Sequence, residues 1–461
     1  MMNSNRRKIL KSAASVPLWG MLPSLADAQS NSGYKALVCI RLEGGNDGYN
    51  TVVPLDSDRY SKYSSVRGPL SLQRGSSDQA LAELPGSGFG LHPALRRLVP
   101  AWNEGALTVV HNVGPLSRPI SQQEFVSWQD SGDTRLVPQS LYSHSDQGFL
   151  WDNASGTAMQ PLGWGGLAAD QTDFNQVISL ATLTRFGMNR QGGALVLPYS
   201  GATMIRVSDS QLATLKSLAT ARTPNVMQDA YSQRLNMALE VNKSFSPLLQ
   251  LPLGAAGLAS AINSSFTGMS TSTLTKQLFQ VAKIIDARSM LGGSRHIFYV
   301  QLGGFDTHGQ QVSGGAAHAG THAELLAQVG EGMSMFWETM KKLGLANQVT
   351  MFTTSDFGRT LRSNSSLGTD HGWGNEQLIL GGGVKGGNTY GSFPDLTLGG
   401  PNDAGDPRLP PNSNSGRWIP TTSVDQMAAP LVSWWNPGAN IDAVLPNLGK
   451  FATRDLGFMK V

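Results

Sequence analysis

The chain has 461 residues, a formal net charge of +3 and a single cysteine, Cys39. Residues 1–28 hold four basic side chains and one aspartate, a net of +3, so the remainder is formally neutral and its bulk charge predicts no nucleic-acid or anionic-membrane surface. A lone cysteine excludes an intramolecular disulfide, so stability must come from a core, and about 430 residues can build one or two.

The N-terminal segment predicts export. Basic residues that include Arg6 and Arg7 precede a short, interrupted apolar stretch that ends at Ala26-Asp27-Ala28, which is the layout of a cleaved signal peptide over residues 1–28. The apolar part is too short to cross a bilayer core of about 30 Å, so we expect no stable membrane span after cleavage. The paired arginines resemble the bacterial twin-arginine signal, which implies a twin-arginine translocase as partner and a periplasmic or secreted protein. A chance pair of arginines before an apolar run is the alternative.

Residues 29–461 predict one α/β domain. Runs of apolar and β-branched residues that end at turn residues such as Gly, Asn or Asp indicate buried strands. Such runs occur at 35–42, 106–114, 295–304, 348–356 and 376–383. Before the fourth run, apolar residues from Leu325 to Met340 recur at helical spacing. Strands that alternate with helices predict a mostly parallel sheet covered on both faces.

The interval from about 205 to 292 differs from the rest of the chain. It contains polar helical stretches with no strand between them, which indicates a helical insertion or cap on the sheet and not a separate domain. The later segment 388–420 is rich in Pro, Gly and Asn, which predicts an ordered surface excursion.

Acids and histidines follow several of these strands. Asp47 follows the first strand, Asp306 and His308 follow the third, and Asp356 and His371 follow the fourth. A parallel sheet brings these strand ends to one edge, where open α/β folds bind ligands. Gathered carboxylates and imidazoles need a compensating charge, and mixed Asp/His ligation suits Zn²⁺ or Mn²⁺, with Ca²⁺ less suited. Ordinary solvated turns are the alternative, because Asp and Gly are common turn residues.

Five segments carry a resemblance to a known family. They are GGNDGYNTVVP, GGFDTHGQQ, TSDFGRT, GTDHGWGN and GRWIPTTSVDQ. They resemble the bacterial family called domain of unknown function 1501, which belongs to the alkaline phosphatase and sulfatase superfamily. The resemblance runs from about residue 35 to the C-terminus. It implies a three-layer α/β/α sandwich and a metal-centred site that hydrolyses phosphate or sulfate esters of a small-molecule or glycan-linked substrate.

The resemblance also assigns roles to the strand-end residues. All five match positions that hold metal in the superfamily. Asp47 matches the aspartate after the first strand, and Asp306 and His308 match a later segment with an acid and a histidine. Asp356 matches the aspartate of an Asp-His pair, and His371 matches the last histidine of the pattern.

Two departures from the superfamily pattern change this expectation. Phe357 replaces the histidine of the Asp-His pair, which puts a two-zinc centre in doubt. No Cys-x-Pro-x-Arg segment is present, so the formylglycine nucleophile of sulfatases is absent.

The resemblance places a nucleophile in the segment 141–156, at the start of a helix. Ser143 is preferred and Ser145 is the alternative, while His144 is a ligand, a proton donor or a positioning group. Arg359 is either a guanidinium that steadies developing charge on the ester or a plain surface arginine. His318 and His322 lie four residues apart, a spacing that suits metal binding, but no zincin motif accompanies them.

Two functions therefore follow from the sequence. The first is an exported, metal-dependent hydrolase of phosphate or sulfate esters. The second is an exported metal-binding or assembly protein that keeps the same fold without turnover, which the missing imidazole at Phe357 favours.

Overall fold

The computed structural model describes residues 33–132, 137–138, 140–154, 161–200, 208–220, 225–410 and 413–460. The predicted signal peptide, residues 1–28, lies outside the described residues. All that follows concerns the unit Tyr34–Val461.

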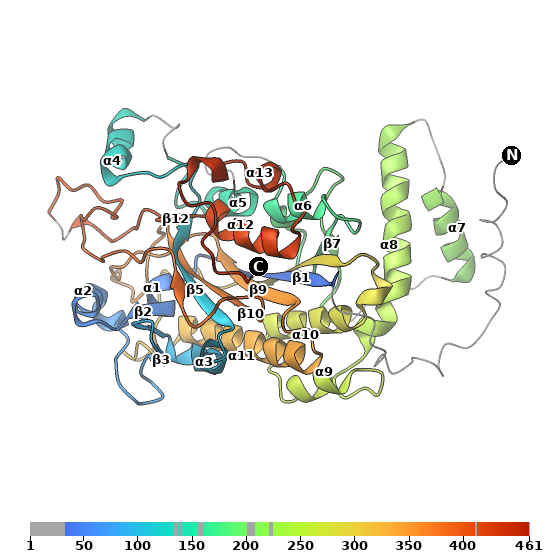
Figure 1. Cartoon of the computed structure of the whole chain (residues 1–461), viewed down its shortest axis with the longest axis horizontal. Helices are drawn as coiled ribbons and strands as arrows, with labels where there is room; N and C mark the ends of the chain where they lie inside the picture. Colours follow the sequence, from blue (N-terminus) through green and yellow to red (C-terminus); the bar gives the residue numbers. More distant parts are fainter. Residues whose placement is uncertain are drawn as a thin grey trace. The chain divides into compact units, whose positions relative to one another are not determined.

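A central sheet forms the middle layer of this unit (Figure 1). Its strands in spatial order are β11 (Thr389–Tyr390), β5 (Leu107–Gly114), β10 (Asn375–Gly381), β9 (Val349–Ser355), β1 (Lys35–Leu42), β8 (Arg295–Leu302), β6 (Val177–Ser179) and β7 (Leu195–Val196), and β12 (Thr422–Ser423) pairs with β5. β1 runs parallel to both β8 and β9, and β10 runs antiparallel to β9 and β5. The predicted mostly parallel sheet is therefore confirmed, with β10 as the reversed strand.

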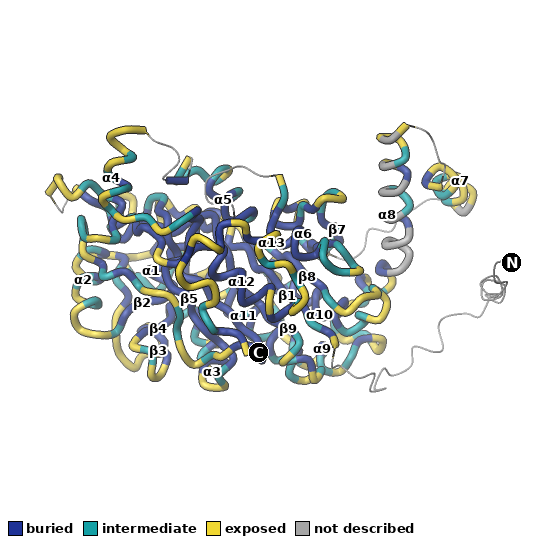
Figure 2. Tube along the Cα trace, turned by 45° about the horizontal axis from the view of Figure 1, so that its top comes forward, coloured by how far each residue is buried: buried dark blue, intermediate teal, exposed yellow. Residues whose placement is uncertain are grey.

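Strand β1 shows why this sheet is covered on both faces. Side chains alternate along a strand, and Val38 and Ile40 enter one apolar cluster whereas Leu37 and Cys39 enter another. Every residue from Ala36 to Leu42 is buried (Figure 2). Because both faces are covered, the strand reads as a continuous apolar run, and Cys39 is a buried member of it.

Helices form the two outer layers, as the predicted α/β/α sandwich requires (Figure 1). One face is packed by α10 (Thr273–Asp286) and α11 (Thr321–Lys342). The other face is packed by α6 (Trp164–Ala169), α12 (Val424–Trp435) and α13 (Ile441–Val444), and α5 (His144–Asn153) lies at its edge.

The remaining elements surround this sandwich. They are α1 (Gly48–Thr51), β2 (Val52–Pro54), α2 (Ser57–Arg67), η3 (Gly68–Leu70), β3 (Ala82–Leu84), β4 (Phe89–Leu91), η4 (Pro93–Leu98), α3 (Val99–Asn103), α4 (Gln122–Ser131), η5 (Arg185–Gly187), η6 (Arg288–Met290) and η8 (Leu448–Lys450). Strands β2, β4 and β3 make a small antiparallel sheet.

Among the described residues between β7 and β8 there are helices and no strand. In order they are α7 (Asp209–Thr220), α8 (Val226–Gln250), α9 (Ser260–Ser265), α10 and the short η6. Helix α10 buries Leu278 and Ile285 in the main core, so it belongs to the layer that covers the sheet.

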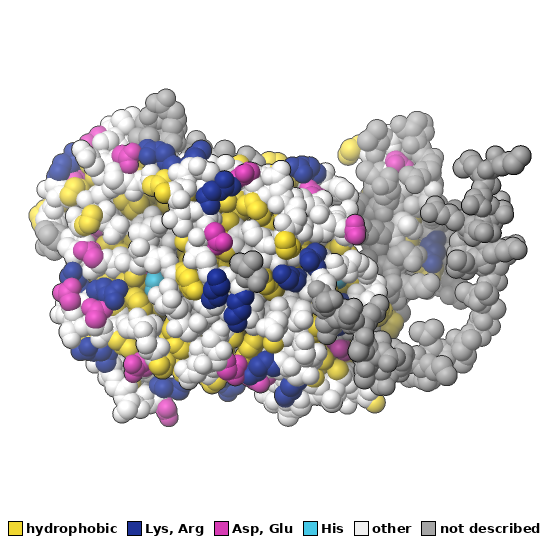
Figure 3. Space-filling model, in the orientation of Figure 1, with side chains coloured by type: hydrophobic (Ala, Val, Ile, Leu, Met, Phe, Trp, Pro, Cys, Tyr) yellow, Lys and Arg dark blue, Asp and Glu magenta, His cyan; other side chains and the backbone are white. Residues whose placement is uncertain are grey.

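The surface and the helices give two further observations. Acidic and basic side chains are interspersed on the face shown in Figure 3, without a large patch of one sign. No helix in the described part of the chain has both the length and the apolar character needed to cross a bilayer.

A buried histidine in β8 predicts a pH-dependent stability. His296 is 0% exposed; its Nδ1 lies 3.3 Å from the hydroxyl of Tyr34 and its Nε2 lies 3.0 Å from the carbonyl oxygen of Gly292. Burial lowers the pKa of His296 to about 4. As pH falls below about 6.5 the unfolded chain takes up this proton before the folded chain does, so the folded state loses stability between pH 6.5 and 4.

We therefore expect the stability advantage of the natural protein over His296→Gln to shrink by about 1.4 kcal/mol per pH unit between pH 6.5 and 4. Urea unfolding of both proteins at pH 7, 6 and 5 measures the difference between their free energies of unfolding. Because all other titrating groups are shared by both proteins, their contributions cancel in this difference. A gap that stays constant across these pH values would contradict the assignment.

Candidate metal centre

The candidate site lies where three parallel strands end together. In the sheet Leu42, the last residue of β1, is in register with Leu302 of β8 and Ser355 of β9. Asp306 and His308 follow β8, and His371 lies in the loop between β9 and β10. This is the edge at which the sequence predicted a site.

Four side chains converge at this edge, one of them from α5. Nε2 of His308 lies 2.7 Å from Nε2 of His371. Oδ1 of Asp306 lies 3.2 Å from the first of these nitrogens and 3.4 Å from the second, and its Oδ2 lies 3.4 Å from Nε2 of His144. Ligand atoms of His144, Asp306 and His371 all lie within 4.8 Å of one another. We call His144, Asp306, His308 and His371 the four-residue cluster.

The outer nitrogen of each imidazole is held by an oxygen. The pairs are His144 Nδ1 with Asp356 Oδ2 at 2.9 Å, His308 Nδ1 with Asp370 Oδ1 at 3.1 Å, and His371 Nδ1 with the carbonyl oxygen of Tyr142 at 2.6 Å. An oxygen acceptor fixes the proton on Nδ1, which leaves the lone pair on Nε2. All three lone pairs then face the four-residue cluster, which is how metal-binding histidines are oriented.

The inner atoms of the four-residue cluster fit a divalent cation. Nε2 of His144 is buried and has no hydrogen-bond partner among the described residues. Two neutral imidazoles whose lone pairs point at each other across 2.7 Å repel unless a cation or a proton lies between them. The imidazoles of His144 and His371 and the carboxylate of Asp306 can hold such a cation, and the imidazole of His308, 2.7 Å from that of His371, can complete the donor set.

Arg359 holds Asp306 in place. Its side chain is 0% exposed, and its N–H groups donate to Asp306 Oδ1 at 2.5 Å and to the backbone carbonyls of Gly44, Gly45, Phe305 and Thr369. Burial raises the pKa of Asp306, but the hydrogen bond and charge of Arg359 outweigh it and keep that pKa below its usual value. Arg359 is thus neither a surface arginine nor free to contact an ester, and it orients Asp306.

Asp356 lies behind His144 and not among the inner atoms. Its Oδ2 accepts from the Gly44 N–H at 3.0 Å as well as from His144, and its Oδ1 pairs with Arg41 at 2.7 Å. The hydrogen bond to Asp356 raises the pKa of His144, although burial opposes it. The structure therefore gives Asp356 the place of a group that orients His144, whereas the sequence predicted a ligand.

Arg41 is a site residue that the sequence reading missed. It lies in β1, is buried, and pairs with Asp152 at 3.4 Å as well as with Asp356. A Cβ atom at Gly148 would lie 2.8 Å from its Nη2, so glycine lets α5 approach closely. The sequence feature that could have identified it is a single arginine within an otherwise apolar strand, because a buried charge needs a partner.

Asp47, the remaining predicted ligand, lies apart from the inner atoms of the four-residue cluster. Its carboxylate is 0% exposed; Oδ1 pairs with Arg67 and Oδ2 accepts from Gln311 Nε2 at 2.6 Å. Since both oxygens are engaged by protein groups, the structure places Asp47 in a buried ion pair.

The predicted nucleophile caps the helix that carries His144. Oγ of Ser143 accepts from the N–H of Asp146 at 3.3 Å and lies 3.1 Å from Oγ of Ser145. Ser143 thus stands beside the four-residue cluster at the positive end of α5, where a helix dipole favours an anion.

Phe357 forms an apolar wall of the site. Its ring centroid lies 4.7 Å from that of His144 and 4.4 Å from that of His371, and the side chain is fully buried. Among the residues that the structure describes, the four-residue cluster supplies the one group of ligand atoms close enough together to hold an ion.

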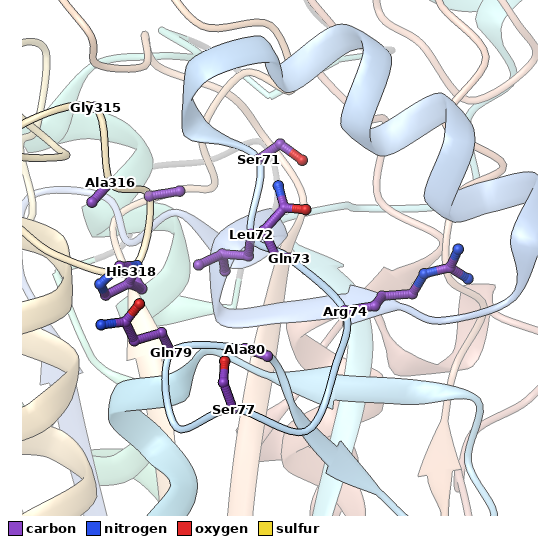
Figure 4. A pocket seen from close by; sticks show the side chains of 11 residues that line it. Ser71, Leu72, Gln73, Arg74, Ser77, Gln79, Ala80, Gly315, Ala316 and His318 are labelled. Carbon is purple, nitrogen blue, oxygen red and sulfur yellow. The ribbon is translucent and has the colours of Figure 1, made fainter.

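The histidine pair 318 and 322 does not form a second centre. His318 lies in the wall of a cavity of about 270 Å³ between the segments 71–80 and 315–318, near Gln79 (Figure 4). His322 is buried, with Nε2 3.0 Å from Oδ1 of Asn46. None of the four-residue cluster lines this cavity.

Comparisons with known proteins give a family and a loose structural likeness. A family model described as "Protein of unknown function (DUF1501)" matches residues 34–403. No curated protein matches the chain. Among solved structures, the chain is similar to the PsFucS1 sulfatase from a Pseudoalteromonas species, with 13% identity over 87% of this chain and 72% of the sulfatase chain and a TM-score of 0.31.

Proposed function

Since the chain belongs to the family of proteins of unknown function DUF1501, whose description states no activity, we propose from the site that it is a metal-dependent hydrolase of phosphate or sulfate esters. We further propose that it is exported through the twin-arginine route, as its N-terminal segment predicts.

One observation carries the first proposal: Nε2 of His144, Nε2 of His371 and the carboxylate of Asp306 lie within 4.8 Å of one another, and Nε2 of His308 lies 2.7 Å from that of His371. The Nδ1 atom of each of these three histidines is held by an oxygen. Imidazole-rich sites with one carboxylate suit Zn²⁺ or Mn²⁺, whereas Ca²⁺ prefers oxygen ligands. Four protein ligands of this kind leave room for a ligand when the cation expands to five coordination.

The chemistry follows from the groups around the four-residue cluster. A divalent cation held there would polarise the non-bridging oxygens of an ester and lower the pKa of a neighbouring hydroxyl or water. Ser143 is the hydroxyl at the start of α5, and the α5 N-terminus favours the negative charge that builds up during attack. Arg359 keeps Asp306 ionised and oriented, and Asp356 orients His144.

A second candidate is metal binding without turnover. It is favoured by the contacts of Ser143, whose Oγ is engaged as a helix cap and lies beside another serine hydroxyl, with no described contact to a general base. Serine nucleophiles normally need such a base or direct activation by a metal.

Reconstitution separates these two candidates. The purified protein is stripped with a chelator, reloaded separately with Zn²⁺, Mn²⁺ and Ca²⁺, and assayed with an aryl phosphate, a phosphodiester and an aryl sulfate. We expect hydrolysis of at least one ester to return with Zn²⁺ or Mn²⁺. We expect Ser143→Ala to retain metal and lose at least about 1,000-fold in rate, with Ser145→Ala as the matched control. Full metal loading without hydrolysis of any of the three esters would establish the second candidate.

A further inference from the structure

Arg417, in the segment between β11 and β12, contacts two residues of the candidate metal centre. Its Nε donates a hydrogen bond of 2.8 Å to the backbone carbonyl of His371, and its guanidinium lies 4.8 Å from the centroid of the Tyr142 ring. Both partners belong to the site, because the Tyr142 carbonyl binds Nδ1 of His371. Arg417 is therefore fixed next to the four-residue cluster from two sides.

Three other arginines around the site are already neutralised. Arg41 pairs with Asp152 and Asp356, Arg67 pairs with Asp47, and Arg359 pairs with Asp306. These three guanidinium groups are buried and cannot bind an additional anion.

Arg417 differs from them in both respects. It is half-buried, and within the described part of the chain its terminal Nη atoms have no hydrogen-bond acceptor and no ion-pair partner. Two nearby carboxylates, those of Asp370 and Asp403, interact with its charge but make their hydrogen bonds to other groups. Asp370 accepts from His308 and Asn364, and Asp403 accepts from the backbone N–H groups of Gly399 and Gly405. An immobilised guanidinium whose two Nη atoms are free to donate matches the paired oxygens of a phosphate or sulfate group.

We infer that Arg417 binds the anionic oxygens of the ester, so the substrates of this site carry a negative charge on the group that is transferred. A neutral carboxylic ester has no such charge and would gain nothing from Arg417. This inference rests on the proposed function and adds the residue that recognises the anionic group of its substrate.

The test uses inorganic phosphate and inorganic sulfate as probes, because binding is then measured without turnover. Their dissociation constants are determined by calorimetry on the metal-reloaded full-length protein, on Arg417→Gln and on Arg417→Lys. The matched control is Arg97→Gln, which removes the same charge from an exposed position on η4. Metal content is measured for every preparation.

We expect Arg417→Gln to keep its metal and to bind the better of the two anions about 10- to 100-fold more weakly, since it loses charge-assisted hydrogen bonds. Arg417→Lys should be intermediate because it keeps the charge and loses the planar fork. Arg97→Gln should bind as the natural protein does. If Arg417→Gln also lost metal, the natural protein would be compared with fully metal-loaded Arg417→Lys instead. An anion affinity of Arg417→Lys equal to that of the natural protein would then overturn the inference.

Two outcomes separate this inference from the proposed function. If Arg417→Gln binds both anions as tightly as the natural protein, or if the metal-loaded natural protein binds neither, the inference is overturned whatever the hydrolysis assays give. If anion binding depends on Arg417 but no ester is hydrolysed, the inference holds and the proposed turnover fails.

Discussion

Replacement of His371 by alanine should abolish both metal binding and the rise in melting temperature that metal produces. His371 contributes one of the three inner nitrogens, and the same loss is expected for His144→Ala, His308→Ala and Asp306→Asn. Bound metal stabilises by mass action, by about 2.7 kcal/mol at a free concentration one hundred times its dissociation constant. Metal analysis after dialysis and thermal unfolding with and without chelator measure the two effects.

The matched control for these variants is His318→Ala, which removes an imidazole from the wall of the separate cavity. It should retain metal and the full metal-dependent rise in melting temperature. If all four variants of the four-residue cluster instead behaved like this control, the strand-end loops would be ordinary solvated turns.

The largest change in metal-independent stability is expected from Asp47→Asn. Asp47 and Arg67 are both 0% exposed and form an ion pair, so removal of the carboxylate charge leaves a buried guanidinium without its counter-charge. Loss of one partner from such a pair costs about 3–5 kcal/mol. Urea unfolding should show this loss equally in the metal-loaded and the chelated protein.

A second substitution at Arg67 tests the same ion pair. In the double variant Asp47→Asn with Arg67→Met no unpaired charge remains, so much of the lost stability should return. The contrary result would support Asp47 as a metal ligand, as the sequence predicted. In that case Asp47→Asn would lose metal, and after chelation the variant would be as stable as the chelated natural protein.

A strand could be predicted where its residues form a run long enough to show the pattern of a buried strand. Strands β1, β8 and β9 are buried on both faces and rich in apolar or β-branched residues, so their parallel packing could be predicted. The run at β10 looks the same, but a continuous apolar run carries no information about strand direction. Strands β6 and β7 have only three and two residues, too few for a period to appear.

The candidate site was predictable in position but not in the direction of each side chain. Asp306, His308 and His371 could be predicted because parallel strands bring their carboxyl ends together. Asp356 and Asp47 also follow strands, but each meets an arginine from another part of the chain, Arg41 and Arg67 respectively. Those pairings depend on tertiary packing.

The most direct measurement of the central claim is a crystal structure of the protein soaked with Mn²⁺ or Zn²⁺, with anomalous diffraction recorded at the absorption edge of the metal. We expect one anomalous peak about 2.0–2.2 Å from Nε2 of His144, His308 and His371 and from a carboxylate oxygen of Asp306. Asp356 and Arg359 should lie behind these ligands with the hydrogen bonds described above. A peak coordinated by Asp47 or Asp356 in place of the four-residue cluster, or no peak at the cluster in metal-saturated crystals, would contradict the account.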